Sequence, residues 1–502
     1  MENSRNTKRA RHRRVRVIQG EDGDFSIDED DYHVIREIML LEGIKEENNI
    51  ATRMPKIVEI REDDNERRVR KFLGFNKGHG AGPELYGATK IVPASIGELT
   101  VLEDLDLSNT EKLSRLPREI GNLTKLVRLS VSGSCFRSVP SSIGQLKCLR
   151  ELYLSSIQIR KLPDELWSLT NLVKLDLSKT GIEFLSPYIG QLTNLEDLKL
   201  RKLSLLNKLP DEIGKLTSLE KLNLSDSGIE SLPSSIQYLE NLRELDLSDT
   251  REHSNFVLPG LSKIPIEIGE LVGLVKLSIS NCRIESLPSS IRKLEKLNDL
   301  DLSMTRSLSR LPNQIGKLTN LVKLNLHSSG IQVLPDSIVD LRYLEVLDLT
   351  STYRLSRLPW HIGKLTNLAK LSLHSSAINY LPPSIQELQN LKDLDLIHMR
   401  DLSRLPEEFG GLKNFAKLNL HSSGIKSLPQ SIQELQNLKD CDLSRTKNLS
   451  RLPEEFGNMT NLGKLNLCGS SIKFLPNSIG QLGNLKELNL CSTEKLSRLP
   501  EE

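Results

Sequence analysis

Leucines recur along most of the chain in one pattern, L-x-x-L-x-L, with Thr or Ser close behind the last leucine. From Leu297 the spacing between repeats alternates strictly between 24 and 23 residues, which makes a 47-residue double unit. The simplest cause is duplication of a two-repeat segment. The 17 repeats start at Leu102, Leu126, Leu149, Leu172, Leu195, Leu219, Leu242, Leu274, Leu297, Leu321, Leu344, Leu368, Leu391, Phe415, Leu438, Leu462 and Leu485.

Each part of the repeat predicts a local structure. Side chains alternate along a strand, so L-x-L predicts a short strand with its leucines facing inward. The Leu-Pro that follows ends the strand direction, and P-x-x-I-G-x-L predicts one or two helical or 3₁₀ turns. The Thr or Ser hydroxyls are expected to bond buried turn backbone. Asn171, Asn320 and Asn437, before the next strand, are expected in left-handed turns.

The repeat resembles the leucine-rich repeat family, in the intracellular class of 23 to 24 residues that includes plant disease-resistance receptors and Ras-suppressor scaffolds. Two segments that carry the resemblance are LVKLNLHSSGIQVLPDSI, from Leu321 to Ile338, and LEDLDLSNTEKLSRLPREIGNLTKL, from Leu102 to Leu126. The resemblance implies an α/β fold: a leucine-rich repeat solenoid, a curved right-handed β-α superhelix with a parallel concave sheet. The receptors' phosphate-binding loop, a kinase motif set and the cysteine caps of secreted members are not in this sequence.

Three regions are expected along the chain. Residues 1–30 are expected to be a disordered tail, basic and then acidic, with nuclear import or an anionic surface as alternative roles for its basic block. Residues 31–69 are a candidate N-terminal cap, in which Tyr32 to Ile44 has helical spacing and is expected to cover the open sheet edge. Residues 70–502 are expected to form the repeat domain.

The repeat domain is expected to hold one degenerate repeat, 17 regular ones and an incomplete end. The degenerate repeat starts near Arg70 and places Leu73 and Phe75, then Val92, Ile96 and Leu99, in core register. The sequence stops at Glu502, directly after LSRLP. We therefore expect a fragment of a longer protein, with a frayed end as the alternative.

Composition narrows the function classes. The chain has 502 residues, 27% of them charged, and a formal net charge of +2, which removes the simplest argument for nucleic-acid binding. No run of 18 apolar residues occurs, so no membrane span is expected. Six scattered cysteines fit reduced thiols of an intracellular protein better than a disulfide framework. A cytoplasmic location is expected, with nuclear import through Lys8 to Arg16 as the alternative.

The histidines and acidic residues fall on repeat positions, so their spacing follows from the length of the repeat and not from a catalytic site. His327, His374 and His421 lie 47 residues apart in one surface column. On every second strand they are about 10 Å apart, too far for neighbours to share one zinc ion. No catalytic residue, metal, cofactor or small-molecule substrate is therefore expected.

Three cysteines occupy repeat positions. Cys468 and Cys491 share the histidine column on adjacent strands, where a disulfide is geometrically allowed but reduced thiols are favoured. Cys441 replaces a core leucine and is expected to be buried and inert.

Strand residues that point away from the leucines should line the concave surface. Their first column alternates in charge sign from Asp104 to Glu487, apart from Val346, which predicts lateral ion pairs between neighbouring strands. The next column alternates Asp with Asn or Ser in the duplicated region. Acids outnumber bases across both columns, which disfavours phosphate backbones.

We predict a noncatalytic protein-binding scaffold or recognition module in intracellular signalling. The alternatives are the sensor portion of a larger immune-type receptor and, less favoured, a nuclear protein associated with nucleic acid. The expected protein-binding residues are Asp301, Asn325, His327, Asp348, His374, Asp395, Asn419, His421 and Asp442. Secondary candidates are Tyr153, the lone aromatic residue of the two columns, and Arg251 and Phe256 in an eight-residue insertion.

Overall fold

A computed structural model describes residues 15–20, 23–41, 58–63, 66–72, 92–110, 114–250 and 260–500. The chain divides into two compact units. Unit 1 comprises Met1–Leu206 with Lys215–Leu219, and unit 2 comprises Asn207–Gly214 with Glu220–Glu502.

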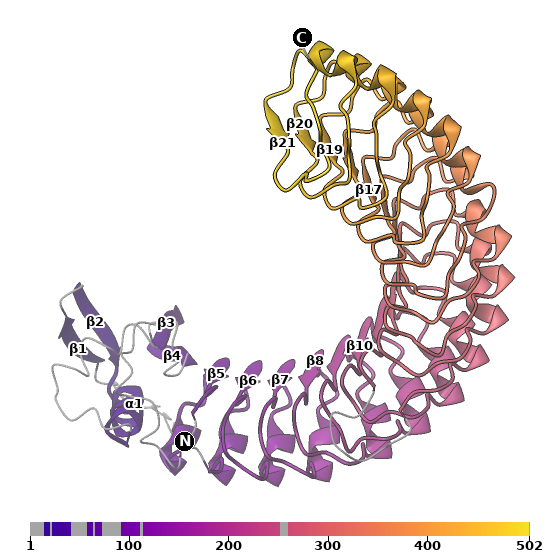
Figure 1. Ribbon diagram of the computed structural model, residues 1–502. Helices are drawn as coiled ribbons and strands as arrows, with labels where there is room; N and C mark the ends of the chain where they lie inside the picture. Colours follow the sequence, from indigo (N-terminus) through magenta and orange to yellow (C-terminus); the bar gives the residue numbers. More distant parts are fainter. Residues whose placement is uncertain are drawn as a thin grey trace, which may run out of the picture. The chain divides into compact units, whose positions relative to one another are not determined.

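The N-terminal part of unit 1 is a small α/β assembly (Figure 1). Strand β1 (Val15–Gly20) pairs antiparallel with β2 (Gly23–Asp28), and helix α1 (Glu29–Leu41) follows. Residues 15–20 and 23–28 are thus ordered, so the expectation of a disordered tail over residues 1–30 is wrong for them. The basic block from Lys8 to Arg14 lies outside the described residues.

The first strands of the main sheet form a hairpin. Strand β3 (Val58–Asp63) pairs antiparallel with β4 (Glu66–Phe72), and β4 runs parallel to the first repeat strand, with Phe72 beside Leu105. Phe72 is fully buried and holds the core position of the degenerate repeat, whereas the expected core residues Leu73 and Phe75 lie outside the described residues. Val92, Ile96 and Leu99 are buried as expected.

Helix α1 covers less of the sheet edge than the sequence predicts. Strand β3 pairs with the outer side of β4, whereas α1 packs against β1, β2 and the 3₁₀ helix η2 (Ala94–Glu98). The carboxylate of Asp31 accepts a 2.9 Å hydrogen bond from the backbone N–H of Val69, which ties α1 to β4.

Every predicted L-x-L segment is a three-residue parallel strand. In unit 1 these strands are β5 (Asp104–Asp106), β6 (Arg128–Ser130), β7 (Glu151–Tyr153), β8 (Lys174–Asp176) and β9 (Asp197–Lys199). In unit 2 they are β10 (Lys221–Asn223), β11 (Glu244–Asp246), β12 (Lys276–Ser278), β13 (Asp299–Asp301), β14 (Lys323–Asn325), β15 (Val346–Asp348), β16 (Lys370–Ser372), β17 (Asp393–Asp395), β18 (Lys417–Asn419), β19 (Asp440–Asp442), β20 (Lys464–Asn466) and β21 (Glu487–Asn489).

The helical turns after Leu-Pro are 3₁₀ helices, in most repeats starting directly after the proline because its fixed φ suits the entry to the turn. Within unit 2 they lie on the outer side and the strands on the inner, concave side (Figure 1). After η2 the 3₁₀ helices are η3 (Arg118–Asn122), η4 (Ser141–Gln145), η5 (Asp164–Ser168), η6 (Pro187–Gln191), η7 (Asp211–Lys215), η8 (Ser234–Tyr238), η9 (Ile266–Glu270), η10 (Ser289–Lys293), η11 (Asn313–Lys317), η12 (Asp336–Asp340), η13 (Ile362–Lys364), η14 (Pro383–Glu387), η15 (Glu407–Gly411), η16 (Gln430–Glu434), η17 (Glu454–Asn458) and η18 (Asn477–Gln481).

The core is a stack of leucines, and threonine hydroxyls beside it bond buried backbone carbonyl groups. Leu324 and Leu326 of one repeat are fully buried, as are the equivalent leucines of its neighbours. The hydroxyl of Thr305 donates to the carbonyl oxygen of Leu302 at 2.6 Å, and Thr446 does the same to Leu443, as predicted. In the partner repeats the prediction is wrong for the described Ser329, Ser376, Ser423 and Ser470, whose buried hydroxyls have no hydrogen-bond partner; the backbone N–H of Ser329 bonds Leu326.

The prediction for the asparagines is wrong. The side-chain amides of Asn171, Asn320 and Asn437 each donate at 2.8 Å to a backbone carbonyl oxygen of the preceding repeat. The left-handed residues lie instead just after the strands, as at Ser328 and Ser375, where φ is +53° and +55°. The asparagines therefore join neighbouring repeats, and the tight turn uses other residues.

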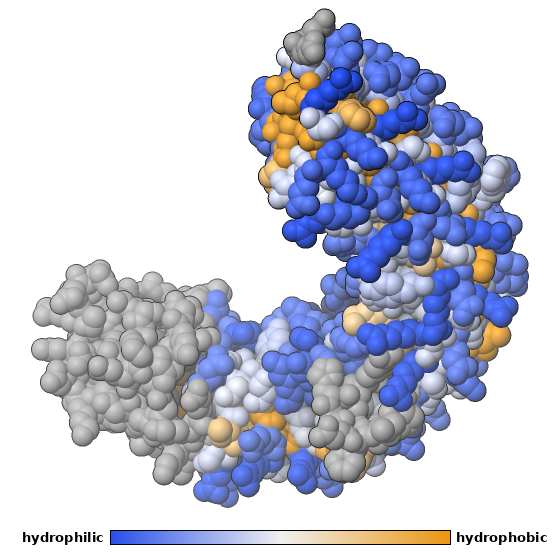
Figure 2. Space-filling model, viewed as in Figure 1, coloured by the Kyte–Doolittle hydropathy of each residue, from blue (hydrophilic) through white to orange (hydrophobic). Residues whose placement is uncertain are grey.

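The last described repeat exposes the kind of leucine that inner repeats bury. All three residues of β21 are exposed, and the exposed fraction of Leu488 is 44%. Figure 2 shows apolar surface gathered at this end of unit 2.

Candidate protein-binding surface

The residues that start the strands form lateral ion pairs in both units. In unit 2, Lys370 lies 3.3 Å from Asp393 on the next strand, and Lys464 lies 2.7 Å from Glu487. Lys417 and Asp440 repeat the arrangement at 3.8 Å. The predicted ladder of alternating charges is confirmed. Most charged residues of this column are paired with a residue of opposite charge on a neighbouring strand.

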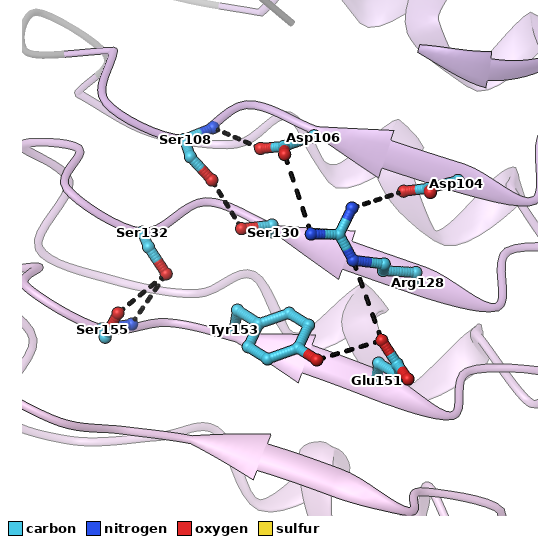
Figure 3. Close-up of polar contacts among 9 residues, drawn as sticks. All are labelled: Asp104, Asp106, Ser108, Arg128, Ser130, Ser132, Glu151, Tyr153 and Ser155. Carbon is cyan, nitrogen blue, oxygen red and sulfur yellow. Dashed lines mark hydrogen bonds and ion pairs between the residues drawn. The ribbon is translucent and has the colours of Figure 1, made fainter. Parts of the chain in front are cut away.

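A denser polar cluster lies on the strand face of unit 1 (Figure 3). The guanidinium of Arg128 on β6 lies 3.1 Å from Asp104 on β5 and 3.8 Å from Glu151 on β7. It also lies 5.4 Å from the ring centroid of Tyr153, whose hydroxyl donates to Glu151 at 3.0 Å. The candidate anchor Tyr153 is thus half-buried and held in place by its neighbours.

Burial and charge shift the pKa values of this cluster. Burial raises the pKa of Asp104 and outweighs the lowering effect of Arg128. Burial would also raise the pKa of Glu151, but hydrogen bonds from Lys174 and Tyr153 prevail and lower it. Burial, with the hydrogen bond to Glu151, raises the pKa of Tyr153. The cluster is a fixed set of opposite charges around one aromatic ring.

The second strand-face column has a structural role that its residue types did not reveal. Each candidate Asp or Asn of the column ends its strand, and its side-chain oxygen accepts a hydrogen bond from the backbone N–H two residues later. These bonds are 2.8 to 3.0 Å long. The residues are Asp301, Asn325, Asp348, Asp395, Asn419 and Asp442. One oxygen of each Asp shapes the turn, and all six side chains remain half-exposed.

Three histidines form a continuous row in unit 2. The ring centroids of His374 and His398 are 5.3 Å apart, as are those of His398 and His421, and both contacts are edge-to-face. The Nδ1 of His374 lies 3.8 Å from a carboxylate oxygen of Asp395, and the Nδ1 of His421 lies 2.7 Å from the hydroxyl of Ser444. His327 is not in the row; its Nε2 contacts the hydroxyl of Ser328 at 3.2 Å.

Sequence reasoning missed His398 because it follows the column by one position. It takes the left-handed position, with φ at +55°, that Ser375 and Ser422 hold in neighbouring repeats. The IHM segment in place of HSS was the available signal. Burial, then repulsion from His374, His421, Arg400 and Arg445, lowers the pKa of His398. Within the described ranges, no three His, Cys, Asp or Glu side chains are arranged to hold a metal ion.

The cysteines give one correction. Cys468 and Cys491 are joined in a disulfide, with Cα atoms 4.6 Å apart, so the preference for reduced thiols is wrong for this pair. Parallel strands in register bring the two residues side by side, and this proximity outweighs the argument from compartment. Cys441 is fully buried as predicted, and burial raises the pKa of its thiol.

Two of the residues that the sequence predicts for binding lie in a segment that the structure does not describe. Arg251 and Phe256 fall in residues 251–259, outside the described residues. Among the helices of the described part, none is long and apolar enough to cross a bilayer.

Family models match large parts of the repeat region. A model described as a leucine-rich repeat region matches residues 84–179 and 313–421, and one described as a leucine-rich repeat matches residues 273–294. One curated relative, a uridine 5′-monophosphate transferase of Xanthomonas campestris, is 33% identical over 69 residues. That match covers 14% of this chain and 13% of the relative's length, so the activity in the relative's name is not assigned to this chain.

Solved structures share the architecture over most of the chain. A leucine-rich repeat protein of Leptospira interrogans is 28% identical, with a TM-score of 0.60, over 80% of this chain and 88% of its own. A plant peptide hormone receptor in complex with its peptide is 27% identical, with a TM-score of 0.56, over 80% and 68% of the two chains. An internalin-type protein of Listeria monocytogenes, 19% identical over 72% and 73% with a TM-score of 0.56, shares the fold.

Proposed function

Because this chain is a leucine-rich repeat protein, we propose that it is a noncatalytic protein-binding module whose partner lies on the concave strand face of unit 2. Leucine-rich repeat proteins are generally protein-interaction modules, and a stacked solenoid offers an extended surface for this purpose. The observation that carries the proposal is the row of His374, His398 and His421, flanked by half-exposed Asp395 and Asp442.

The strip is long enough for a standard interface when a partner also contacts the residues beside the strands. Eight strands, β13 to β20, carry the nine candidate residues and the histidine row. At about 4.8 Å between strands they form a strip roughly 40 Å long. A second dimension of similar size meets the area that stable protein complexes bury, roughly 800 Å² on each partner.

The finer role we propose is a scaffold or recognition module of the intracellular 23- to 24-residue class. A second candidate is the sensor portion of a larger receptor of immune type. The plant hormone receptor favours this candidate, because it binds a peptide and matches 80% of this chain. A chain that captures a short peptide supports the sensor role, and one that joins two folded proteins supports the scaffold.

We propose a cytoplasmic location, with nuclear import through Lys8 to Arg16 as the alternative. An oxidising compartment is a third outcome, because the disulfide between Cys468 and Cys491 is of a kind that persists there. Imaging the full chain beside one that lacks residues 1–16 separates these possibilities.

The test is capture of the partner by variants that keep the fold. Proximity labelling in the native cell identifies the partner, and a pull-down then measures its capture. The variant His374→Gln, Asp395→Asn and His421→Gln changes charge and shape on the strip while retaining the oxygen that bonds the Ile397 backbone. We expect capture to fall about tenfold or more, as for loss of central interface residues.

A matched control changes the outer side of unit 2 in nearby repeats. Lys317→Gln and Lys364→Gln alter exposed residues of η11 and η13 and should leave capture unchanged. Equal capture by the wild type and the concave variant, with loss after deletion of residues 251–259, would place the partner on that insertion and refute the concave assignment.

A further inference from the structure

A second surface of unit 2 carries more positive than negative charge. It is formed by the segments between the strand ends and the Leu-Pro pairs, from residue 306 to residue 500. These segments hold thirteen exposed Lys or Arg and two acids, Asp401 and Glu494. The thirteen, which we call the cationic ribbon, are Arg306, Arg310, Arg354, Arg357, Arg400, Arg404, Lys426, Arg445, Lys447, Arg451, Lys473, Lys495 and Arg498.

The ribbon differs from the other cations of the same repeats. On the strand face, Lys370, Lys417 and Lys464 each lie within 4 Å of a carboxylate. No described carboxylate forms an ion pair with any of the thirteen ribbon residues at that distance. Their charge is therefore available to a partner.

The backbone arranges the ribbon with a regular spacing. Residues just before Leu-Pro form parallel β-bridges between adjacent repeats, for example Arg451 with Phe474 and Phe474 with Arg498. Each bridge separates backbones by about 4.8 Å, so Arg451 and Arg498 lie about 10 Å apart. The same spacing holds by repetition for Arg310, Arg357 and Arg404, since all five recur every 47 residues.

Aromatic and apolar side chains alternate with these arginines. The residues between them in the column are Val333, Tyr380, Ser427 and Phe474. Phe474 is 49% exposed, and the guanidinium of Arg498 lies 5.9 Å from its ring centroid. Trp360 is 60% exposed and stacks on Tyr380, with ring centroids 6.5 Å apart.

Around the stacked pair lies a pocket of about 430 Å³. Its lining includes Val333, Trp360, Tyr380 and Pro382, with Arg357 and Asp336 as its charged members. It is large enough for one apolar side chain, and it lies directly on the ribbon. Trp, Tyr and Arg are the residue types most enriched at the energetic centres of protein interfaces.

We propose that the cationic ribbon is a docking surface for an extended acidic segment of a partner protein, with acids about every third residue and an apolar side chain in the Trp360 pocket. An extended chain advances about 3.3 Å per residue, so every third residue matches the 10 Å spacing of the arginines. A polynucleotide is the competing anionic occupant, and the test below distinguishes it from the peptide.

This surface adjoins the concave strip at Arg400 and Arg445, which lie near His398, but its test changes other residues. The probe is a synthetic peptide, (Glu-Ser-Pro)₈, whose binding to the full chain is measured by fluorescence anisotropy at low and physiological salt. We expect saturable binding that weakens as salt rises, whereas (Lys-Ser-Pro)₈ does not bind. Replacing one central Ser by Leu should tighten binding, and Trp360→Ala should abolish that gain.

Two triple variants with identical spacing decide the assignment. Arg357→Gln, Arg404→Gln and Arg451→Gln remove three ribbon charges and should weaken peptide binding about tenfold. Lys370→Gln, Lys417→Gln and Lys464→Gln remove three strand-face charges, also 47 residues apart, and should leave it unchanged. The concave variant with His374→Gln should likewise bind the peptide normally, which keeps this test distinct from that of the concave strip.

Three results would overturn the proposal. The first is no binding of the acidic peptide, and the second is equal loss in the two triple variants when both unfold like the wild type. The third is binding of a 24-residue deoxythymidine strand more tightly than the peptide at the same salt, lost in the Arg357, Arg404 and Arg451 variant. That result would assign the ribbon to nucleic acid.

Discussion

At the scale of single residues, several side chains that the sequence identified only as candidate binding groups also have a structural role. Asp395 is an example. One oxygen accepts the backbone N–H of Ile397 at 3.0 Å, and the other lies 3.8 Å from His374. An alanine substitution at such a position disturbs the fold and the surface together.

We predict that Asp395→Ala lowers the free energy of unfolding by about 1 kcal/mol, the usual net value of one hydrogen bond. Asp395→Asn keeps the accepting oxygen and should cost less than about 0.5 kcal/mol, as surface changes do. Urea unfolding of both variants checks this. Equal destabilisation by the two substitutions would mean that the hydrogen bond to Ile397 contributes nothing.

At the scale of elements, the turn after each strand brings together side chains from neighbouring repeats. The turn after β17 places His398 between His374 and His421, and burial and the adjacent positive groups lower its pKa. The folded state then binds the proton less well than the unfolded state, whose histidine has a pKa of about 6.5. Stability from this site is therefore complete above about pH 6.5 and declines as the pH falls through the lowered value.

We predict that lowering the pH from about 7.5 to about 5.5 destabilises the chain through His398. The groups that set the effect are His374, His421, Arg400 and Arg445. His398→Gln should reduce the loss of unfolding free energy across this range, measured with urea at both pH values. His361→Gln, at an exposed position before η13, should leave the loss unchanged, and an identical loss in both variants would exclude His398 as its source.

At the scale of the whole molecule, each repeat contributes leucines to a core that it shares with its neighbours. Leu326 is fully buried, and its backbone N–H bonds Asp348 on the next strand. A charge at this position has no partner and no access to water. Damage at one repeat should therefore spread to both adjacent repeats.

We predict that Leu326→Asp costs several kcal/mol, on the order of 3 to 5, because it buries an unpaired charge. Hydrogen exchange should show lost protection in β13, β14 and β15 together. Gln332→Asp, at an exposed position of the same repeat, serves as the control and should match the wild type. Protection lost in β14 alone would contradict a shared core.

The resemblance and the period predicted the family and fold, because the pattern of core leucines recurs at every strand. The residue that starts each strand from Asp104 to Glu487 was identified by counting alone. The sequence also predicted the ion pairs of Lys370 and Lys464. Side chains alternate between the two faces of a strand, so equivalent residues of adjacent repeats lie side by side on the same face.

Only the tertiary structure decided which side chains meet across repeats. The turn geometry at φ +55° inserts His398 between two histidines that sequence spacing placed about 10 Å apart. The bridges beside Leu-Pro align Arg451, Phe474 and Arg498, and pairing in register brings Cys468 to Cys491. The physical reason is that leucine burial specifies the inward positions of a repeat, whereas contacts between outward positions depend on local backbone angles that the hydrophobic period does not encode.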